Sequence, residues 1–474
     1  MDNPIRTRMA PSPTGELHIG SLRTALYDYA LAKQQQGQFI LRIEDTDQKR
    51  YVPGSDTRLL QVLKDFGLNW DEGPEIGGQY GPYIQTERLP IYQQYLKELI
   101  DKGDAYYCFC TEEKLTQARE IQKAAKKIPR YDRCCLKLSP QQVKENLANG
   151  IPYVVRMKVP ENETLIFNDL VRGEVKFNTN DVDDQVLMKS NGIPTYHFAV
   201  VVDDHLMKIT HVFRGEEWLP SVPKHILLYR YFGWEMPQHA HLSIFLDPSH
   251  PGKMSKRYGT VSAQGFLAEG YLPEAMMNFL MLLGWNPGTE KEIYSLAEFI
   301  NDFKIERLNK KPAIFDRKKL DYFNGIYIRQ LSSEKLFDYF KKFLPQASDD
   351  QINILMPVLK ERIVKFSDLV ISTKFLFEDL DYSKELLLKK GTDPKLAIEM
   401  LTQAKNLFTD FSNLQTRIMD LIKQNNWNTG EFFMVFRVAI CGSEYTPPVV
   451  DCLPALGQEA TIRKIDIALN KLLN

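Results

Sequence analysis

The first 47 residues contain the feature that most limits the folds open to this chain: a strand, a tight turn, a helix and a second strand follow one another closely. IRTRMA (5–10) is a candidate short strand. Residues 20–35 carry apolar side chains at helical spacing, with one face formed by Leu22, Ala25, Leu26 and Tyr29. Gly37 ends this helix, and QFILRIEDTD (38–47) is typical of a buried strand that runs into a polar turn. Such a strand–helix–strand unit builds a parallel sheet, so we predict an α/β domain.

The turn before the helix, PSPTGELHIG (11–20), places an imidazole at a helix entrance. A helix start offers unpaired N–H groups and the positive end of the dipole, and it therefore binds anions readily. Two glycines let the backbone approach a ligand and two prolines stiffen the turn: Gly15, Gly20, Pro11 and Pro13. His18 can then donate to a phosphate oxygen at the mouth of the sheet. On this turn alone, a capping or surface histidine is the commoner outcome.

The rest of the chain changes character twice. From about residue 90 to 194, helical stretches, clustered cysteines and a basic run precede the strand candidates IPYVVRMKVP and LVRGEVKF. The strand–helix alternation then resumes near IPTYHFAVVVDD, so we expect an insertion within the sheet domain. After about residue 325 amphipathic segments such as LKERIVKFSDLVISTKFLF (359–377) and TIRKIDIALNKLL (461–473) predict an all-helical C-terminal region.

Composition limits the partners of the chain. Its 474 residues are enough for about three domains. Sixty Lys and Arg stand against 61 Asp and Glu, so any nucleic-acid surface must be a local patch. No apolar leader follows Met1, and no run of about 18 apolar residues occurs. We therefore expect a cytoplasmic, multidomain protein without membrane contact.

A second stretch, GKMSKR (252–257), concentrates Lys253, Lys256 and Arg257 in a loop entered through glycine. Three cations in five residues repel one another unless an anion lies between them. A solvated basic loop is the commoner fate of such a run. Here, however, a parallel-sheet pattern separates this loop from the first turn, as expected for a two-sided clamp on a triphosphate.

HIGS (18–21) and KMSKR (253–257) resemble the two signatures of the class I aminoacyl-tRNA synthetases. Further stretches narrow the resemblance to the bacterial glutamyl-tRNA synthetases: RMAPSPTGELHIG, RIEDTD, YVPG, DEGP, GPYIQTERLPIYQ, PTYHFAVVVDDHLM and RGEEW. The resemblance covers nearly the whole chain and is strongest in residues 6–100 and 190–260. It implies a Rossmann-like parallel sheet with an inserted acceptor-binding domain, followed by an all-helical anticodon-binding region.

The resemblance also implies a reaction in two steps. Glutamate attacks the α-phosphate of ATP to give glutamyl adenylate and pyrophosphate, and the glutamyl group then passes to the 2′-hydroxyl of the terminal adenosine of tRNA. Positioning and charge stabilisation suffice for this chemistry, with Mg²⁺ neutralising the pyrophosphate. The implied catalytic residues are His18, Lys253 and Lys256, of which Lys256 is the principal lysine. The implied ATP-binding residues are His18, Gly20, Glu217, Trp218, Leu246, Lys253 and Lys256.

A glutamate pocket must satisfy two carboxylates and one ammonium group. An arginine side chain can bind a buried carboxylate through two parallel hydrogen bonds. The resemblance assigns glutamate binding to Arg8, Ser12, Glu44, Tyr196 and Arg214. A structural ion pair is the alternative for Glu44 and Arg214. Some relatives have an asparagine where this chain has Val200, which puts one side-chain contact in doubt.

The cysteines suggest a metal site. Cys108, Cys110 and Cys135, with Tyr131, resemble the zinc-binding insertion of part of the family, and Cys-x-Cys with a later Cys supplies three soft ligands. Those relatives have a histidine where this chain has Lys137. The fourth ligand would then come from Tyr131, Cys134 or water. Three buried free thiols are the alternative.

The resemblance divides the chain into four parts: 1–89 with 195–252 for catalysis, 90–194 for the acceptor arm, 253–327 for the KMSKR loop and stem contacts, and 328–474 for the anticodon. Residues 119–137 hold seven basic against two acidic side chains, and 304–319 form a second basic stretch. Phosphate contacts of this kind position RNA without reading its sequence. The candidate tRNA-binding residues are Lys126, Lys127, Arg130, Lys310, Lys311 and Arg362. We expect a monomer whose partners are tRNA(Glu), ATP and L-glutamate.

Three other functions share part of this pattern. Glutaminyl-tRNA synthetase shares both signatures but has a different acidic motif and a β-barrel C-terminal half. The glutamyl-queuosine paralogue lacks an anticodon-binding part and is much shorter. A nucleotidyltransferase that never binds tRNA would leave the basic insertion and the helical tail without a role. Charging of tRNA(Gln) in addition to tRNA(Glu) is compatible with the sequence.

Overall fold

In the computed structural model the described residues are 4–126, 128–248, 252 and 260–473. They fall into two compact units. The first comprises Met1–Phe266 and Met277–Asp316, and the second comprises Leu267–Met276 and Arg317–Asn474. Residues 90–194 lie within the first unit, whereas residues 253–327 are shared between the two. The division into four functional parts remains a prediction.

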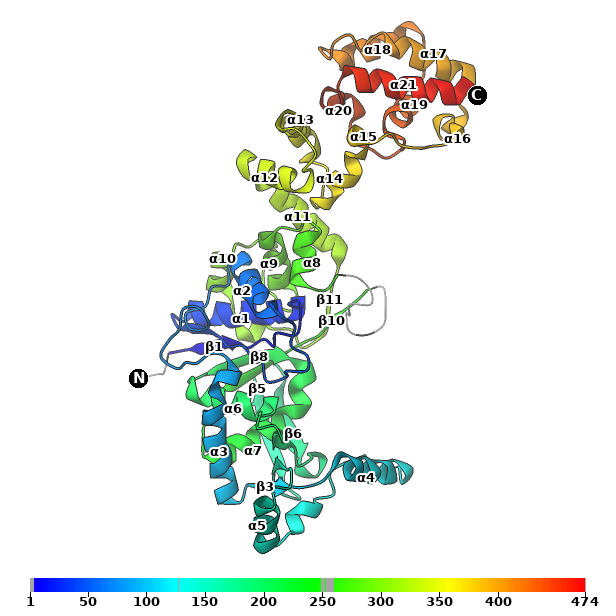
Figure 1. Ribbon diagram of the computed structural model, residues 1–474. Coiled ribbons are helices and arrows are strands. Elements are labelled where there is room, and N and C mark those ends of the chain that lie inside the picture. The colour runs from blue at the N-terminus through cyan, green and yellow to red at the C-terminus, as the bar shows by residue number, and fades with distance from the viewer. Residues whose placement is uncertain (1–3, 127, 249–251, 253–259, 474) are drawn as a thin grey trace. The chain divides into compact units, whose positions relative to one another are not determined.

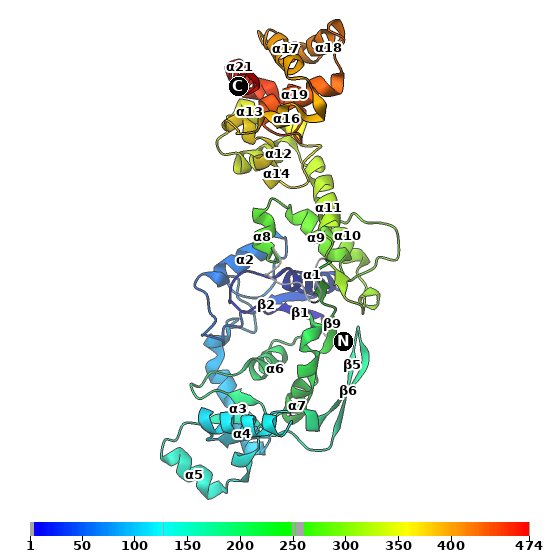
Figure 2. The same cartoon turned by 90° about the vertical axis from the view of Figure 1, so that its right-hand side faces the viewer.

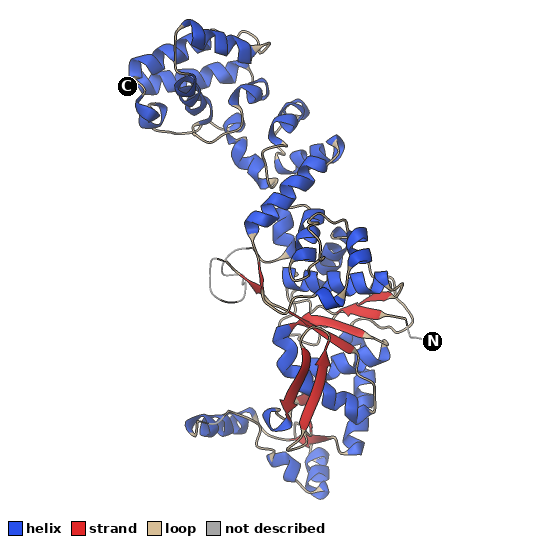
Figure 3. Cartoon of the chain, turned by 180° about the vertical axis from the view of Figure 1, so that it is seen from behind, coloured by secondary structure: helices blue, strands red, loops and turns tan. Residues whose placement is uncertain are grey.

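The first unit is built on parallel strands, as predicted (Figure 3). β1 (Arg6–Met9) pairs in parallel with β2 (Gln38–Leu41) across helix α1 (Ile19–Gln34). β8 (His211–Gly215) pairs in the same way with β9 (Gln238–Leu242), and helix α7 (Val222–Phe232) connects them. β1 lies next to β8, so these two two-stranded parallel sheets lie side by side and form one layer, the parallel layer.

Helix α1 is buried more completely than its sequence suggests. Leu22, Ala25 and Leu26 are fully buried, as predicted, whereas Tyr29 is only half-buried. Tyr27, on another face, has no exposed surface either, because α1 lies between β1 and β8 on one side and helix α10 (Leu296–Asp302) on the other. An apolar stripe becomes an all-round buried helix when a second layer covers it.

The insertion contributes an antiparallel sheet and a long hairpin to the first unit (Figure 1). The sheet has the order β3 (Ala105–Cys108), β4 (Val154–Met157), β7 (Val186–Met188). The hairpin joins β5 (Thr164–Asp169) to β6 (Gly173–Asn178), and its tip reaches β9 of the parallel layer (Figure 2). The further elements of this unit are α2 (Ser55–Asp65), α3 (Leu89–Lys102), α4 (Glu112–Ala124), α5 (Pro140–Ala148), α6 (Tyr196–Leu206), β10 (Phe245–Leu246) and β11 (Ala313–Ile314). Helices α8 (Ala263–Ala268) and α9 (Pro273–Leu282) cross the boundary between the units.

The second unit contains helices and no strand in the part of the chain that the structure describes, which confirms the predicted helical region. Its helices are α11 (Arg317–Gln330), α12 (Ser333–Phe343), α13 (Asp349–Leu359), α14 (Ser367–Ser372), α15 (Lys374–Phe377), α16 (Lys384–Leu387), α17 (Pro394–Lys405), α18 (Leu414–Gln424), α19 (Thr429–Cys441), α20 (Val449–Leu456) and α21 (Gln458–Leu473). They enclose one continuous apolar core. None of the helices described in either unit is long and apolar enough to cross a membrane.

One amphipathic segment of this region contains a break between two helices. Residues 359–377 do not form a single amphipathic helix, because α13 ends at Leu359 and α14 begins at Ser367. The Asp368 carboxylate accepts hydrogen bonds from the N–H groups of Val364 and Lys365, at 3.0 and 3.1 Å, and Asn324 donates to the Val364 carbonyl at 2.6 Å. These side chains satisfy backbone groups that a continuous helix would have paired internally.

Candidate functional site

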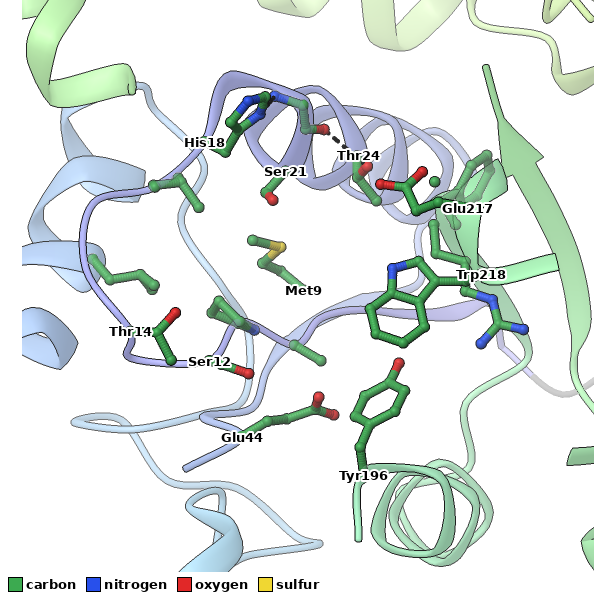
Figure 4. A pocket seen from close by; sticks show the side chains of 18 of the residues that line it. Met9, Ser12, Thr14, His18, Ser21, Thr24, Glu44, Tyr196, Glu217 and Trp218 are labelled. Carbon is green, nitrogen blue, oxygen red and sulfur yellow. Dashed lines mark hydrogen bonds between the residues drawn. The ribbon is translucent and has the colours of Figure 1, made fainter. Parts of the chain in front are cut away.

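A cavity of about 950 Å³ opens where the parallel strands of the first unit end (Figure 4). Residues that follow β1, β8 and β9 line it together with the start of α1, and the first turn of α6 contributes Tyr196. Ligands of open α/β sheets bind at this edge. Nine residues predicted from the sequence line the cavity: Arg8, Ser12, His18, Gly20, Glu44, Tyr196, Arg214, Glu217 and Trp218.

One predicted residue lies elsewhere, and two others lie outside the described residues. Leu246 does not line the cavity, whereas its neighbour Phe245 does. Val200, which stands where some relatives have an asparagine, is buried in an apolar core that α6 and α7 share with the insertion, and it does not line the cavity. Lys253 and Lys256 belong to the segment that is not described.

His18 is the N-cap of α1. Its Nδ1 accepts a hydrogen bond from the N–H of Gly20 at 2.9 Å. A neutral imidazole that accepts at Nδ1 carries its proton on Nε2, so His18 can donate from that nitrogen. The capping role and the phosphate-binding role are therefore compatible in one side chain.

The chain on both sides of the lysine-rich stretch is anchored at this cavity. Before it, Ile244 and Phe245 line the wall. After it, the N–H of Ile19 donates to the carbonyl of Val261 at 3.0 Å, and the N–H of Ala263 donates to that of Leu17 at 2.8 Å. Described residues on both sides of the stretch thus lie at or beside the cavity, and those after it contact the entrance of α1.

Buried charges form a network beneath the cavity. The Arg8 Nε donates to the Asp204 carboxylate at 3.2 Å, and Arg42, fully buried, pairs with Asp204 at 2.8 Å and with Glu44 at 2.9 Å. Burial alone would raise the pKa of Asp204, but Arg8 and Arg42 outweigh it and hold that pKa below its usual value. Burial also raises the pKa of Glu44, to about 7, although Arg42 and Arg8 oppose the rise. Glu44 therefore both takes part in an ion pair and lines the cavity.

Tyr196 and Trp218 form the opposite wall, with ring centroids 5.0 Å apart, and Glu44 points toward them (Figure 4). Burial raises the pKa of Tyr196, and so does the nearby Glu44 carboxylate, so its phenol is protonated and can donate a hydrogen bond. The Trp218 ring is 40% exposed at the rim, where a flat ligand could stack on it.

Arg214 is held in a different way from Arg8. Its Nε donates to His241 Nε2 at 2.9 Å and its Nη1 lies 3.4 Å from His225 Nδ1. Its Nη2 is buried and has no hydrogen-bond acceptor among the residues that the structure describes. Burial lowers the pKa of the guanidinium, and no described carboxylate pairs with it. The positive charge of Arg214 is therefore not compensated by a described carboxylate, and it can pair with an anionic ligand.

The cysteines of the insertion come together, as predicted. The Sγ atoms of Cys108, Cys110 and Cys135 lie within 4.8 Å of one another. The Tyr131 Oη lies 3.2 Å from the Cys108 Sγ and 3.6 Å from the Cys110 Sγ. The Cys134 Sγ is 3.2 Å from the Cys110 Sγ but falls outside the mutually close set. All six cysteines are free thiols.

Four of the six candidate tRNA-binding residues are exposed, three in the first unit and one in the second. Lys126, Lys310 and Lys311 are exposed in the first unit, and Lys127 lies outside the described residues. Arg130 is half-buried and pairs with Asp181 at 3.1 Å. Arg362, in the second unit, is exposed in the turn after α13.

Sequence reasoning missed several charged residues around the cavity. Asp203, Asp204 and Arg42 stand inside quoted stretches but had no role assigned to them. The sequence feature that could have indicated them is the pair of adjacent acidic residues at the end of the apolar helix segment HFAVVVDD. Charges in such an apolar segment are seldom buried unless they are paired, so these residues predict buried ion pairs. The histidines around Arg214 had no comparable local signal.

Comparisons with known proteins agree with this architecture. The profile of the class I tRNA synthetases (E and Q), catalytic domain, matches residues 4–322, and that of an anticodon binding domain matches residues 335–469. Glutamate–tRNA ligases of Clostridium botulinum (strain Loch Maree) and Clostridium tetani are 42% and 43% identical to the chain, with 100% of this chain and 99% of each relative covered.

Solved structures give the same result. A glutamate tRNA ligase from Elizabethkingia meningosepticum, crystallised in complex with its amino acid, has a TM-score of 0.84 at 39% identity, over 99% of this chain and 100% of that one. The glutamate–tRNA synthetase of Elizabethkingia anophelis has a TM-score of 0.85 at 39% identity, with the same shares covered. The chain belongs to the class I tRNA synthetases for glutamate and glutamine.

Proposed function

We propose that this protein is a glutamate–tRNA ligase that joins L-glutamate to tRNA(Glu) through a glutamyl-adenylate intermediate. The observation that carries the proposal is the cavity at the strand ends, where a helix entrance capped by His18 faces two buried arginines and Glu44. A nucleotide phosphate, two substrate carboxylates and one ammonium group would each find a complementary partner there. Relatives of full length that are named glutamate–tRNA ligases support the same substrate.

In this proposal His18, Gly20, Glu217 and Trp218 bind ATP. The Nε2 proton of His18 and the helix start stabilise charge on the phosphates, and Trp218 stacks on the adenine. Lys253 and Lys256 would supply positive charge to the phosphates, an assignment supported by the contacts of residues 261–263 with residues 17–19. Mg²⁺ would neutralise the pyrophosphate as it leaves.

Glutamate would lie deeper in the cavity. Arg8, with Ser12, and Arg214 would bind the two carboxylates, Glu44 would accept from the ammonium group, and Tyr196 would donate from the opposite wall. Glu44 has a pKa of about 7 in the free protein, and a bound ammonium group would favour its charged form. The pocket would therefore recognise the zwitterion and the side chain together.

The thiol cluster fits a structural zinc ion. Three sulfur atoms within 4.8 Å of one another, with a phenol oxygen 3.2 Å from one of them, match the spacing of ligands around a tetrahedral ion. Cys108, Cys110 and Cys135 would hold the ion, with Tyr131 as the fourth ligand. The ion would fix the chain around β3 without taking part in the reaction.

tRNA would contact both units. Lys126, Lys127 and Arg130 would meet the acceptor arm, Lys310 and Lys311 the inner stem, and Arg362 the anticodon. The match of residues 335–469 to an anticodon binding domain supports the last assignment. We expect the protein to act as a monomer in the cytoplasm.

The decisive experiment is ATP–pyrophosphate exchange with glutamate, run with and without tRNA, followed by charging of purified tRNA(Glu) and tRNA(Gln). We expect exchange only when tRNA is present, and charging of tRNA(Glu). Charging of tRNA(Gln) with glutamine would favour the glutamine branch of the family. Exchange that never requires tRNA would favour a nucleotidyltransferase.

A further inference from the structure

The tip of the β5–β6 hairpin carries a carboxylate that the proposed reaction does not use. Asp169 has no exposed side-chain surface and accepts several hydrogen bonds. Two come from the turn itself, from the N–H groups of Val171 at 2.9 Å and Arg172 at 2.8 Å. The others come from His241 of β9, whose N–H lies 3.1 Å and whose Nδ1 lies 2.6 Å from Oδ2. The carboxylate thus bonds β9 as well as its own turn.

These contacts determine where the proton of His241 lies. The Arg214 Nε has a hydrogen and no lone pair to offer, so His241 Nε2, 2.9 Å away, must be the acceptor. The proton of the neutral ring is then on Nδ1 and is donated to Asp169. Burial lowers the pKa of His241, although its bond to Asp169 opposes this, and the neutral form fits both contacts.

We propose that Asp169 and His241 are positioning residues for glutamate: Asp169 fixes the His241 tautomer that accepts from Arg214 Nε, and this leaves Arg214 Nη2 for a substrate carboxylate. The inference rests on the proposed function, because the substrate is glutamate only if that function is correct. The inserted hairpin thereby contributes to the amino-acid pocket without lining it.

A neighbouring contact holds the same turn in place. Arg172 pairs with Glu216 at 2.6 Å, and its Nη1 donates to the Lys310 carbonyl at 2.7 Å. Glu216 in turn accepts from the N–H of Ile244, at 2.9 Å, next to the cavity wall. The tip is therefore bonded to three segments of the parallel layer and its surroundings, which keeps Asp169 at a constant position relative to His241.

Three variants separate positioning from simple support of the fold. Asp169→Asn keeps the shape of the side chain, but its amide N–H can donate to His241 Nδ1. This donation favours the His241 tautomer that carries its hydrogen on Nε2, and that hydrogen would then face the N–H of Arg214. His241→Gln places an amide oxygen where Nε2 lies and keeps an acceptor for Arg214. His241→Asn keeps a donor toward Asp169 and removes the acceptor for Arg214. Asp184→Asn, another buried carboxylate of the insertion, bonded to Tyr106 and Arg133, is the matched control.

The measurement is glutamate-dependent ATP–pyrophosphate exchange in the presence of tRNA, with the KM for glutamate, the KM for ATP and the melting temperature of each full-length variant. We expect Asp169→Asn and His241→Asn to raise the KM for glutamate at least tenfold, while the KM for ATP changes less than twofold. His241→Gln should raise the KM for glutamate less than threefold, and Asp184→Asn should leave the KM for glutamate unchanged. Added to His241→Gln, Asp169→Asn should have little further effect, because an amide has no tautomer to misplace.

An equal rise in KM from Asp169→Asn in both backgrounds would overturn the inference and leave Asp169 as a support of the turn. If Asp169→Asn does not fold, equal KM values for His241→Asn and His241→Gln overturn it just as well, and unequal values in the stated order support it. Absence of glutamate-dependent exchange in the unmodified protein would instead refute the proposed function itself.

Discussion

Two arginines border the same cavity, and their surroundings differ. Arg8 donates to Asp204, which also pairs with Arg42, so its charge is compensated within the protein. Arg214 is surrounded by neutral imidazoles and has an unsatisfied buried nitrogen. A buried cation at this cavity can thus be paired with a carboxylate of the protein, as Arg8 is, or lack such a partner, as Arg214 does, and we expect the loss of the two side chains to affect stability differently.

The largest expected effect is at Arg214. We expect Arg214→Ala to lower kcat/KM for glutamate about a thousandfold, corresponding to roughly 4 kcal/mol, because a desolvated substrate carboxylate loses its partner. The melting temperature should fall less than in Arg8→Ala, since Arg214→Ala leaves neutral imidazole acceptors, and no described carboxylate, without a partner. Steady-state exchange and thermal unfolding measure the two quantities. A fall in stability comparable to that of Arg8→Ala, which does strip a partner from Asp204, would break the comparison.

Substitution of Asp204 should mainly lower the stability of the protein, in contrast to substitution of Arg214. Asp204→Asn removes the compensating charge of Arg8 and Arg42, and we expect the free energy of unfolding at pH 7 to fall by about 3 kcal/mol. Because the folded-state pKa of Asp204 is lowered, its stabilisation is present above the ordinary carboxyl pKa and is lost as pH falls through the folded value. The deficit of the variant, measured by urea unfolding, should therefore shrink in acid. A deficit that does not depend on pH would contradict this.

Glu44 gives a pH test of the pocket between them. Its pKa in the free protein is raised to about 7, and a bound ammonium group should lower it. Glutamate should therefore bind best above pH 7, with kcat/KM falling up to about tenfold per unit as pH drops below 7. Glu44→Gln should abolish this slope, which a pH profile of exchange would show. A profile unchanged in the variant would exclude Glu44 as the group that titrates.

The smallest effect is expected at Tyr196. Tyr196→Phe removes the hydroxyl that would donate one hydrogen bond to glutamate and keeps the ring next to Trp218. Such a bond contributes about 1 kcal/mol, so kcat/KM for glutamate should fall about fivefold, with the KM for ATP unchanged. A loss as large as that of Arg214→Ala would mean that the phenol, and not the guanidinium, is the main determinant.

Much of the site could be predicted because its residues stand in short, distinctive stretches. His18, Glu44 and Arg214 lie next to glycines, prolines or acidic turns at strand ends, where local sequence constrains both backbone and chemistry. Leu246 shows the limit of this approach, since a shift of one residue in a two-residue strand decides whether Phe245 or Leu246 lines the cavity. Their contacts with ligands remain predictions.

The features of the fold and the site that the sequence did not predict depend on contacts between residues distant in sequence. Asp169 and His241 are 72 residues apart, and only the hairpin register brings them together. The break after Leu359 depended on Asn324 and Asp368, which compete with the helix for backbone groups. Periodicity reports which face is apolar but not which outside partner will end a helix.

The hairpin that reaches β9 has a consequence for engineering. An inserted module that is bonded only at its two chain junctions can be exchanged between relatives as a cassette. Here the turn 169–173 is also bonded to the parent sheet, through Asp169 and Arg172. A chimaera that imports a foreign module must therefore include a compatible turn. Without it, the recipient would bind the amino acid more weakly, while its binding of the nucleotide would be retained.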